Sequence, residues 1–150
     1  NGTDLLINKG KENQLKEGMI VIRGNKDLNT AILIGKIIQV NPISSLVSLP
    51  SSTNKEIAVE LKEGGEGFVK GRINGELELF NVLQEVEITQ NELVVTSGKE
   101  EKYPKGLVIG RVKNIIKEES EVYQKAIIEP IRKYSELKNI FVVLVSDFKR

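Results

Sequence analysis

The chain has 150 residues, 39% of them hydrophobic and 5% aromatic, which suits one domain or two very small ones with a core of branched aliphatic side chains. Its 22 basic and 21 acidic residues alternate without blocks, which argues against electrostatic capture of nucleic acid or anionic lipid as its main activity. The sequence has no cysteine and no histidine, which excludes disulfides, thiolate or imidazole metal sites, and catalysis that needs either side chain.

Short apolar runs, separated by Gly, Pro, Asn and Ser, predict β-strands along nearly the whole chain. In order, the expected strands span Asp4–Lys9, Met19–Arg23, Thr30–Val40, Leu46–Leu49, Glu56–Leu61, Phe68–Ile73, Glu76–Phe80, Leu93–Thr96, Leu107–Ile116, Ala126–Glu129 and Ile140–Val145. Leu15 is expected to fill the core from a polar connection, and Gly35 predicts a bulge or bend within its strand. Asn74-Gly75 is a strong two-residue hairpin signal.

One β unit occurs twice. Gly18–Ile22 has its counterpart in Asn91–Val95, and Leu33–Ile37 has its counterpart in Val108–Val112. Two half-size copies predict two small barrels in tandem rather than one larger sandwich.

The fold class that follows is all-β, a pseudo-repeat of two small barrels with at most one short helix, at Ile131–Lys138. We expect residues 1–82 to form the first barrel and residues 83–150 the second, with strands that can be exchanged between them. No run of about 18 apolar residues is present, and the sequence starts without Met. We therefore expect a fragment of a longer protein whose targeting signals have been removed.

No catalytic, cofactor-binding or metal-binding residue is predicted. The glycine cluster Gly64–Gly67 lacks the Gly-Lys-Ser/Thr ending of a phosphate loop and opens no helix, so it indicates a tight turn. Without histidine, Ser97 could be activated only by Lys99 or Lys105, which lie in an exposed charged loop, so catalysis by such a pair is not expected. The three aspartates are scattered singly rather than spaced as in a calcium loop: Asp4, Asp27 and Asp147.

A second interpretation is a barrel of the OB type that binds single-stranded nucleic acid. Basic residues on the predicted strands could form its binding face: Lys36, Lys70, Arg72 and Arg111. Such a face interleaves cations with stacking aromatic rings, whereas here only Phe68 lies close to them. Solvated strand faces explain these cations better.

Three motifs, in order, resemble a known family. Residues of LLINKGKENQLKEGMIVI match an Ile-Asn-Lys-Gly strand followed by a Val/Leu-x-x-Gly-Met turn, namely Ile7, Asn8, Lys9, Gly10, Leu15, Gly18 and Met19. The second motif consists of LVVTSG, followed by Tyr-Pro-x-Gly and then Ile-Gly-Arg-Val. Its residues are Leu93–Gly98, Tyr103, Pro104, Gly106 and Ile109–Val112. The third is Ala-x-Ile-x-Pro and a later leucine: Ala126, Ile128, Pro130 and Leu137. Together they resemble the extracytoplasmic domain of the rod shape-determining protein MreC family.

The chain departs from the family pattern at two places. Asn91-Glu92 stands where the family has Gly-Asp, and Lys99–Glu101 replaces a Leu-Gly-Gly insert. The tip of this hairpin therefore presents a more charged surface than the family pattern does.

The resemblance implies a non-enzymatic scaffold of the cell-elongation machinery, without cofactors, built from two six-stranded barrels. It implies a single-pass membrane protein whose missing N-terminal helix and coiled coil precede this extracytoplasmic domain. The partners implied are further copies of itself, as a dimer or filament, a penicillin-binding transpeptidase and other elongation proteins, but no nucleic acid. Candidate contact residues are Phe68, Val69, Phe80, Tyr103 and Pro104, for each of which ordinary core or turn packing is the alternative.

Overall fold

The structure, a computed structural model, describes residues 4–24, 31–52, 55–99, 102–131 and 140–143. Its strands are β1 (Asp4–Ile7), β2 (Ile20–Arg23), β3 (Ile32–Val40), β4 (Ser45–Ser48), β5 (Glu56–Leu61), β6 (Glu66–Gly71), β7 (Leu77–Leu83), β8 (Leu93–Thr96), β9 (Val108–Ile116), β10 (Tyr123–Pro130) and β11 (Ile140–Val143). A single 3₁₀ turn, η1 (Lys11–Asn13), is the helical element within these ranges. The all-β prediction is confirmed, while the helix predicted at Ile131–Lys138 lies, beyond its first residue, outside the described residues.

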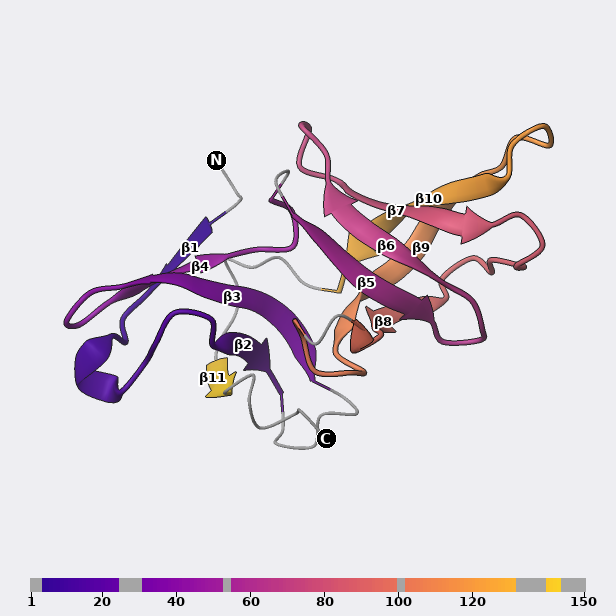
Figure 1. Ribbon diagram of the computed structural model, residues 1–150. Coiled ribbons are helices and arrows are strands. Elements are labelled where there is room, and N and C mark those ends of the chain that lie inside the picture. The colour runs from indigo at the N-terminus through magenta and orange to yellow at the C-terminus, as the bar shows by residue number, and fades with distance from the viewer. Residues whose placement is uncertain (1–3, 25–30, 53–54, 100–101, 132–139, 144–150) are drawn as a thin grey trace.

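Strands β5 to β10 close into a barrel of six strands. Each strand pairs antiparallel with two neighbours, around the ring β5-β6-β7-β10-β9-β8 and back to β5. Figure 1 shows this barrel as one lobe of an elongated molecule. Closure satisfies the backbone groups of all six strands without leaving a free edge.

The other lobe, called here the first lobe, contains β1 to β4 and β11 (Figure 1). Its strands pair antiparallel in the order β1-β4-β3-β2-β11. Among the described residues, β1 and β11 each pair with one strand only, so the first lobe shows an open sheet with two edges.

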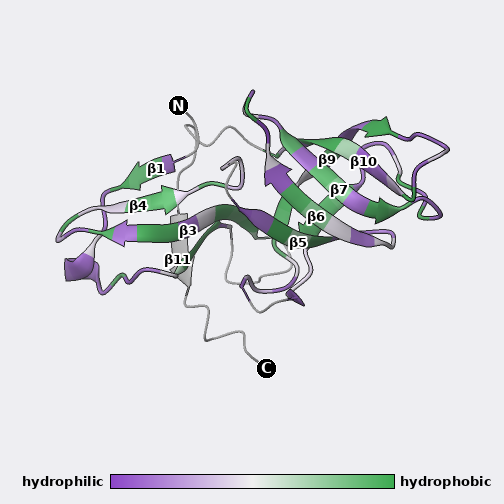
Figure 2. Ribbon diagram, turned by 45° about the horizontal axis from the view of Figure 1, so that its top comes forward, coloured by the Kyte–Doolittle hydropathy of each residue, from purple (hydrophilic) through white to green (hydrophobic). Residues whose placement is uncertain are grey.

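Side chains that alternate along the strands supply two apolar clusters. The larger fills the barrel with residues such as Val69, Leu79 and Ile128, each at most 1% exposed. The smaller, around Val21 and Ile34, lies in the first lobe, where Leu15 packs against it as predicted. Buried and more exposed side chains alternate along β5, β6 and most of β7, which is the two-residue period of a strand with one buried face, and Figure 2 shows both apolar and polar stretches along β7.

A short parallel pairing between β3 and β9 joins the two lobes. Ile32 is in register with Val108, and the Val108 amide donates a 2.9 Å hydrogen bond to the Ala31 carbonyl. The larger apolar cluster crosses the same place, because Ile20 and Leu33 of the first lobe belong to it. The lobes therefore share a continuous core but little backbone pairing.

The predicted repeat appears as two equivalent bulged strand pairs. In the β2–β3 pair, Val21 faces Gly35 while Ile22 faces Leu33, so one residue of β3 is left over. In the β8–β9 pair, Val94 faces Gly110 while Val95 faces Val108, so one residue of β9 is left over in the same way. An extra residue on one strand bends and twists the pair, as a small, tightly curved sheet requires.

Several element boundaries differ from those predicted; β7, for example, ends at Leu83 rather than Phe80. The β6–β7 connection spans residues 72–76 rather than Asn74-Gly75 alone: the Arg72 amide donates to the Glu76 carbonyl at 2.8 Å, and the Asn74 side-chain oxygen accepts the Glu76 amide at 3.0 Å inside this turn. Strand β10 begins at Tyr123 rather than Ala126, since Tyr123 and Lys125 pair with Leu83 and Ile116. No helix in the described ranges is both long and apolar enough to cross a membrane.

Candidate protein-interaction site

An aromatic pair lies on the outer surface of the barrel. Phe68 of β6 and Phe80 of β7 are register partners, with ring centroids 5.9 Å apart and planes tilted by 34°. The Lys70 ammonium lies 4.5 Å from the centre of the Phe80 ring, which is a cation–π geometry. All three side chains are half-buried and point away from the core, because they alternate with the inward-facing Val69 and Leu79. We call Phe68, Lys70 and Phe80 the aromatic face.

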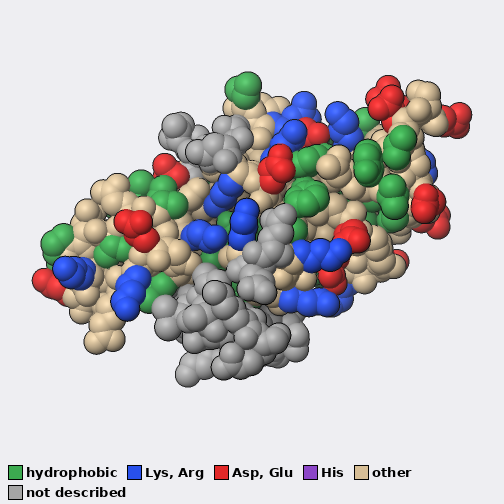
Figure 3. All heavy atoms as spheres, in the orientation of Figure 1, with side chains coloured by type: hydrophobic (Ala, Val, Ile, Leu, Met, Phe, Trp, Pro, Cys, Tyr) green, Lys and Arg blue, Asp and Glu red, His purple; other side chains and the backbone are tan. Residues whose placement is uncertain are grey.

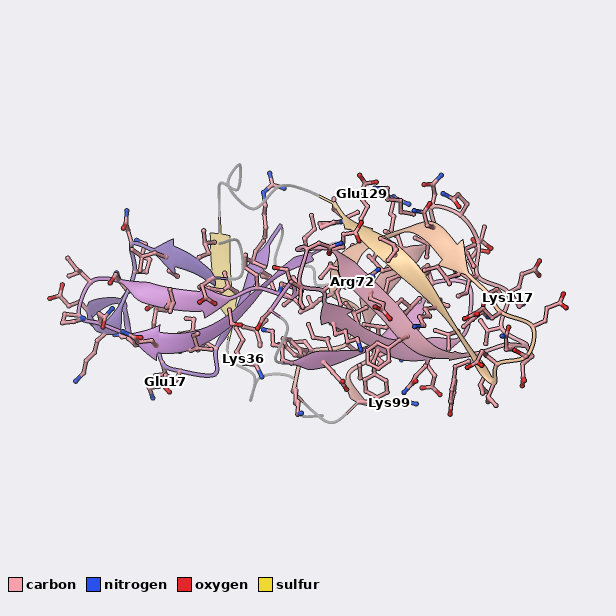
Figure 4. All side chains as sticks on the ribbon, turned by 90° about the horizontal axis from the view of Figure 1, so that it is seen from above. Glu17, Lys36, Arg72, Lys99, Lys117 and Glu129 are labelled. Carbon is pink, nitrogen blue, oxygen red and sulfur yellow. The ribbon has the colours of Figure 1, made fainter. Side chains whose placement is uncertain are left out.

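A groove of about 300 Å³ adjoins Phe68. Its lining residues come from β5, β6, β7 and the end of β8: Ala58, Val59, Glu66, Gly67, Phe68, Asn81, Ser97 and Lys99. The Lys99 ammonium and the Glu66 carboxylate form an ion pair at its rim, and Figure 4 places Lys99 at this side of the barrel. An apolar floor with a charged rim is the composition of many protein–protein contact surfaces.

The hairpin between β8 and β9 is held by Thr96, which is fully buried. Its hydroxyl donates to the Pro104 carbonyl and accepts the Leu107 amide at 2.8 Å. These bonds fix the position of Tyr103 and Pro104, both buried. The two ends of the loop turn at Gly98 and Gly106, whose φ angles of 77° and 91° favour glycine.

Tyr103 meets two lysines where the lobes join. The Lys36 ammonium of β3 lies 4.6 Å from the centre of the Tyr103 ring, and the Lys55 ammonium lies 6.0 Å from it. Lys55 also donates to the Tyr103 hydroxyl at 3.3 Å and to the Ser48 carbonyl at 3.1 Å. We call Lys36, Lys55 and Tyr103 the junction cluster; Figure 4 shows Lys36 between the two lobes, and Figure 3 shows basic side chains gathered there.

Burial dominates the ionisation of this cluster. It lowers the pKa of Lys55 to about 8, with a further decrease from the charge of Lys36 and an opposing effect of Asp4. Burial likewise lowers the pKa of Lys36, helped by the charge of Lys102. The pKa of the Tyr103 hydroxyl is raised to about 12 for the same reason.

The five candidate contact residues lie in three different places. Phe68 and Phe80 come together on the aromatic face, whereas Tyr103 and Pro104 lie in the buried loop at the junction. Val69 is fully buried in the barrel, where it is the register partner of Leu79 on the neighbouring strand. Sequence reasoning placed Lys70 and Lys36 on strands but did not connect them with rings, and no local signal tied Lys55 to Tyr103.

The arrangement around Ser97 does not suit a serine–lysine pair. The Ser97 hydroxyl accepts the backbone amide of Lys99 at 3.2 Å, while the Lys99 ammonium pairs with Glu66. The Lys105 ammonium lies 4.0 Å from a carboxylate oxygen of Glu60. Both lysine side chains are thus directed to glutamates on the barrel surface. Within the described ranges, no cluster of three or more acidic residues has a geometry that could hold a metal ion.

The four cations of the proposed nucleic-acid face each have a nearby protein partner. Arg72 lies 3.8 Å from Glu76 and 3.7 Å from Glu78, and Arg111 donates to the Asn91 carbonyl at 2.9 Å. Lys36 and Lys70 lie over separate rings on different parts of the molecule. These four cations therefore do not form a continuous basic surface with aromatic rings on which nucleic-acid bases could stack.

Sequence comparison decides the family. The family described as "Rod shape-determining protein MreC, barrel core" matches residues 2–144, nearly the whole chain. The chain belongs to the MreC family. It is 27% identical over 149 residues to the cell shape-determining protein MreC of Bacillus subtilis, covering 91% of this chain but 50% of that protein. The chain thus spans about half the length of this MreC relative.

Solved MreC structures share the fold. The crystal structure of MreC from Pseudomonas aeruginosa superposes with a TM-score of 0.80 at 24% identity, covering 95% of this chain and 90% of that one. A structure of the major periplasmic domain of the cell shape-determining filament MreC gives 0.72 at 18% identity, covering 95% and 87%. MreC in its complex with the penicillin-binding protein PBP2 from Helicobacter pylori gives 0.70 at 19% identity, covering 97% and 88%.

Proposed function

We propose that this chain is the extracytoplasmic part of a single-pass membrane protein that maintains rod shape as a non-enzymatic scaffold of cell elongation. It binds a penicillin-binding transpeptidase and other elongation proteins, and it associates with itself as a dimer or filament. A membrane helix outside these 150 residues anchors it to the cell membrane. No step of this function needs a cofactor or a nucleic acid.

The observation that carries the proposal is the aromatic face on a barrel of this family. Half-buried phenylalanines on the outside of a barrel add little to its core, whereas aromatic anchors dominate the energetics of protein interfaces. A solved structure of a relative with the same fold is its complex with PBP2, which supports a transpeptidase as the partner. The periplasmic origin of another relative supports an extracytoplasmic location.

We further propose that the first lobe is a second six-stranded barrel, one that stays open at the edge of β1. Its five described strands repeat the strand pairing of the barrel around one bulge, which supports a common architecture. We take residues 1–82 and 83–150 as the two units. The closed barrel then contains β5 to β7 from the first unit and β8 to β10 from the second. The two units are then linked by exchanged strands.

Self-association is proposed to use the free edge of β1. This strand pairs only with β4 among the described residues, and Leu6 at its centre is 62% exposed. An unpaired edge carrying an exposed apolar side chain can accept a strand of a second copy. The relative described as a cell shape-determining filament supports self-association in general.

The transpeptidase interaction can be tested with the purified extracytoplasmic domain of a transpeptidase from the same cell. Phe68→Ala and Phe80→Ala should each weaken binding about 10-fold or more, because truncating an interface anchor costs about 1–2 kcal/mol or more. Ile73→Ala is the matched control, since Ile73 is fully exposed but isolated in the β6–β7 turn, and it should leave binding unchanged. A wild-type protein that binds no transpeptidase would contradict the proposal.

Analytical ultracentrifugation tests self-association separately. The wild type should show a sedimentation coefficient that rises with concentration, and Leu6→Glu should abolish this rise by placing a charge at the β1 edge. Ile73→Glu is the control for an added surface charge. A wild-type monomer at all concentrations would contradict the self-association proposal but leave transpeptidase binding standing.

A further inference from the structure

The junction cluster combines hydrogen-bond donors from three separate parts of the chain. Lys36 comes from β3, Lys55 from the connection before β5, and Tyr103 from the β8–β9 loop. The cluster therefore lies between the two lobes rather than within either of them, and the larger apolar cluster forms one side of it through Tyr103.

Counting donors shows what the cluster can still bind. An ammonium group has three N–H donors, and two of those on Lys55 are used by the Ser48 carbonyl and the Tyr103 hydroxyl. The Tyr103 hydroxyl accepts from Lys55, so its own proton is available for donation. The Lys36 ammonium contacts the π face of Tyr103. This cation–π contact is weaker than a hydrogen bond to an oxygen acceptor, so the N–H groups of Lys36 can still donate to an oxygen.

The local charge balance is positive. Lys36 and Lys55 act on each other as like charges, and Lys102 adds a third positive charge that acts on Lys36. Within the described ranges, Asp4 is the carboxylate whose charge opposes them at Lys55. Like charges held together in a partly buried position destabilise the cluster, and an anion between them would remove that repulsion.

We propose that the junction cluster of Lys36, Lys55 and Tyr103 binds the oxygens of a phosphate group between the two lobes. Two ammonium groups and one hydroxyl, brought together around the Tyr103 ring from different elements, suit a tetrahedral oxyanion, for which lysine is a common ligand. The phosphate can be free in solution or part of a polyanionic chain, since both present the same oxygens. Bound there, it would tie β3 to the β8–β9 loop through a shared acceptor.

The test is a titration of ¹⁵N-labelled protein with inorganic phosphate at pH 7 and low salt, followed by NMR. Saturable shifts should appear at Lys36, Lys55 and Tyr103, and sodium sulfate should compete for the same site. Lys36→Gln and Lys55→Gln should each weaken binding at least about 5-fold, and Tyr103→Phe about 2–3-fold, because they remove a charged and a neutral donor respectively. Lys117→Gln, at the distal β9–β10 tip, is the matched control and should leave affinity unchanged.

Sodium polyphosphate provides the second arm. If the protein binds both phosphate and polyphosphate, and Lys36→Gln and Lys55→Gln lose both, the site takes free phosphate. If the protein binds polyphosphate alone, and the same variants lose it, the source is a polyanionic chain. Phosphate shifts that are identical in Lys36→Gln, Lys55→Gln and the wild type would overturn the proposal, as would no binding of either anion at about 10 mM. Thermal unfolding of each variant shows whether it remains folded, so a loss of binding can be assigned to the donor.

Discussion

Gly35 and Gly110 occupy equivalent positions in the two halves of the chain. Each follows the extra residue of a bulge, and each faces the backbone of the next strand. A Cβ atom at Gly35 would lie 2.2 Å from the Ser48 carbonyl oxygen, and one at Gly110 would lie 2.4 Å from the Glu129 carbonyl oxygen. The two halves of the chain therefore share a close approach between backbones at this glycine, in addition to a similar pattern of apolar residues.

Gly35→Ala and Gly110→Ala should therefore each lower the free energy of unfolding by about 1–3 kcal/mol, because a methyl group forces rigid backbone apart. Denaturant-induced unfolding followed by circular dichroism measures the change. Gly75→Asn is the control, because Gly75 lies in an open turn with a φ of 88° that asparagine tolerates. Equal stability of Gly35→Ala and the wild type would show that β3 and β4 can separate without cost.

Glu92 connects two loops at one end of the barrel. Its buried carboxylate accepts the Glu63 amide at 2.8 Å and the Thr89 amide at 2.9 Å. Glu92→Ala leaves both amides without this acceptor and should cost about 2–4 kcal/mol, since each charge-assisted bond contributes about 1.5–3 kcal/mol. Hydrogen exchange of the two amides should accelerate in parallel. Glu87→Ala, an exposed control in the same segment, should change stability by no more than about 0.5 kcal/mol.

The Phe68–Phe80 contact should be measurable apart from partner binding. A double-mutant cycle with Phe68→Ala and Phe80→Ala should give a coupling of about 0.5–1.5 kcal/mol in the free energy of unfolding. Adding Lys70→Met to Phe80→Ala should give a smaller coupling of about 0.5–1 kcal/mol from the cation–π contact. Additive effects in the first cycle would mean that the rings do not interact in solution.

The free energy of unfolding should increase as the pH rises above neutrality, because the pKa of Lys55 is lowered in the folded chain. Its pKa is lowered from 10.5 to about 8 in the folded chain, so between these values the unfolded chain binds more protons and unfolding becomes less favourable as pH increases. The groups acting on Lys55 are Lys36, Asp4 and Tyr103, and the lowered pKa of Lys36 acts in the same direction. We expect a gain of no more than about 1–2 kcal/mol between pH 7 and 10, after allowance for the partial exposure of this side chain.

The raised pKa of Tyr103 opposes this trend only above pH 10, where the unfolded hydroxyl ionises before the folded one. Unfolding titrations of the wild type and Lys55→Met across this range separate the two contributions. The pH-dependent gain should be largely lost in Lys55→Met, which keeps most of the aliphatic stem but has no ammonium group. An unchanged gain in this variant would assign it to other residues.

The sequence predicted the features that local patterns determine. Alternation located most strands, and Gly35 indicated a bulge or bend in its strand before any pairing was known. The strand order of the barrel could not be read in this way, because the β5–β8 and β7–β10 pairings depend on which distant apolar faces bury one another. Local alternation also did not show that β10 begins at Tyr123, where polar residues pair with strands of the same barrel.

The candidate site shows the same division. Phe68 and Phe80 could be selected as aromatic residues on predicted neighbouring strands, and their contact follows from the hairpin register. Lys55 lies 48 residues before Tyr103, and the hydrogen bond between them depends on how the two lobes meet. Burial, which lowers the pKa of Lys55, is a property of that meeting and leaves no local sequence signal.

The single register pair between Ile32 and Val108 has a mechanical consequence. One pair of backbone partners resists stretching along the strands but offers little resistance to rotation about them, so the angle between the lobes depends on the side chains that fill the corner. Tyr103 is one of these side chains. A ligand or substitution at Tyr103 would turn the aromatic face relative to the β1 edge and leave the fold of each lobe intact. The distance between a partner on the aromatic face and a partner on the β1 edge would then change, although Tyr103 contacts neither partner.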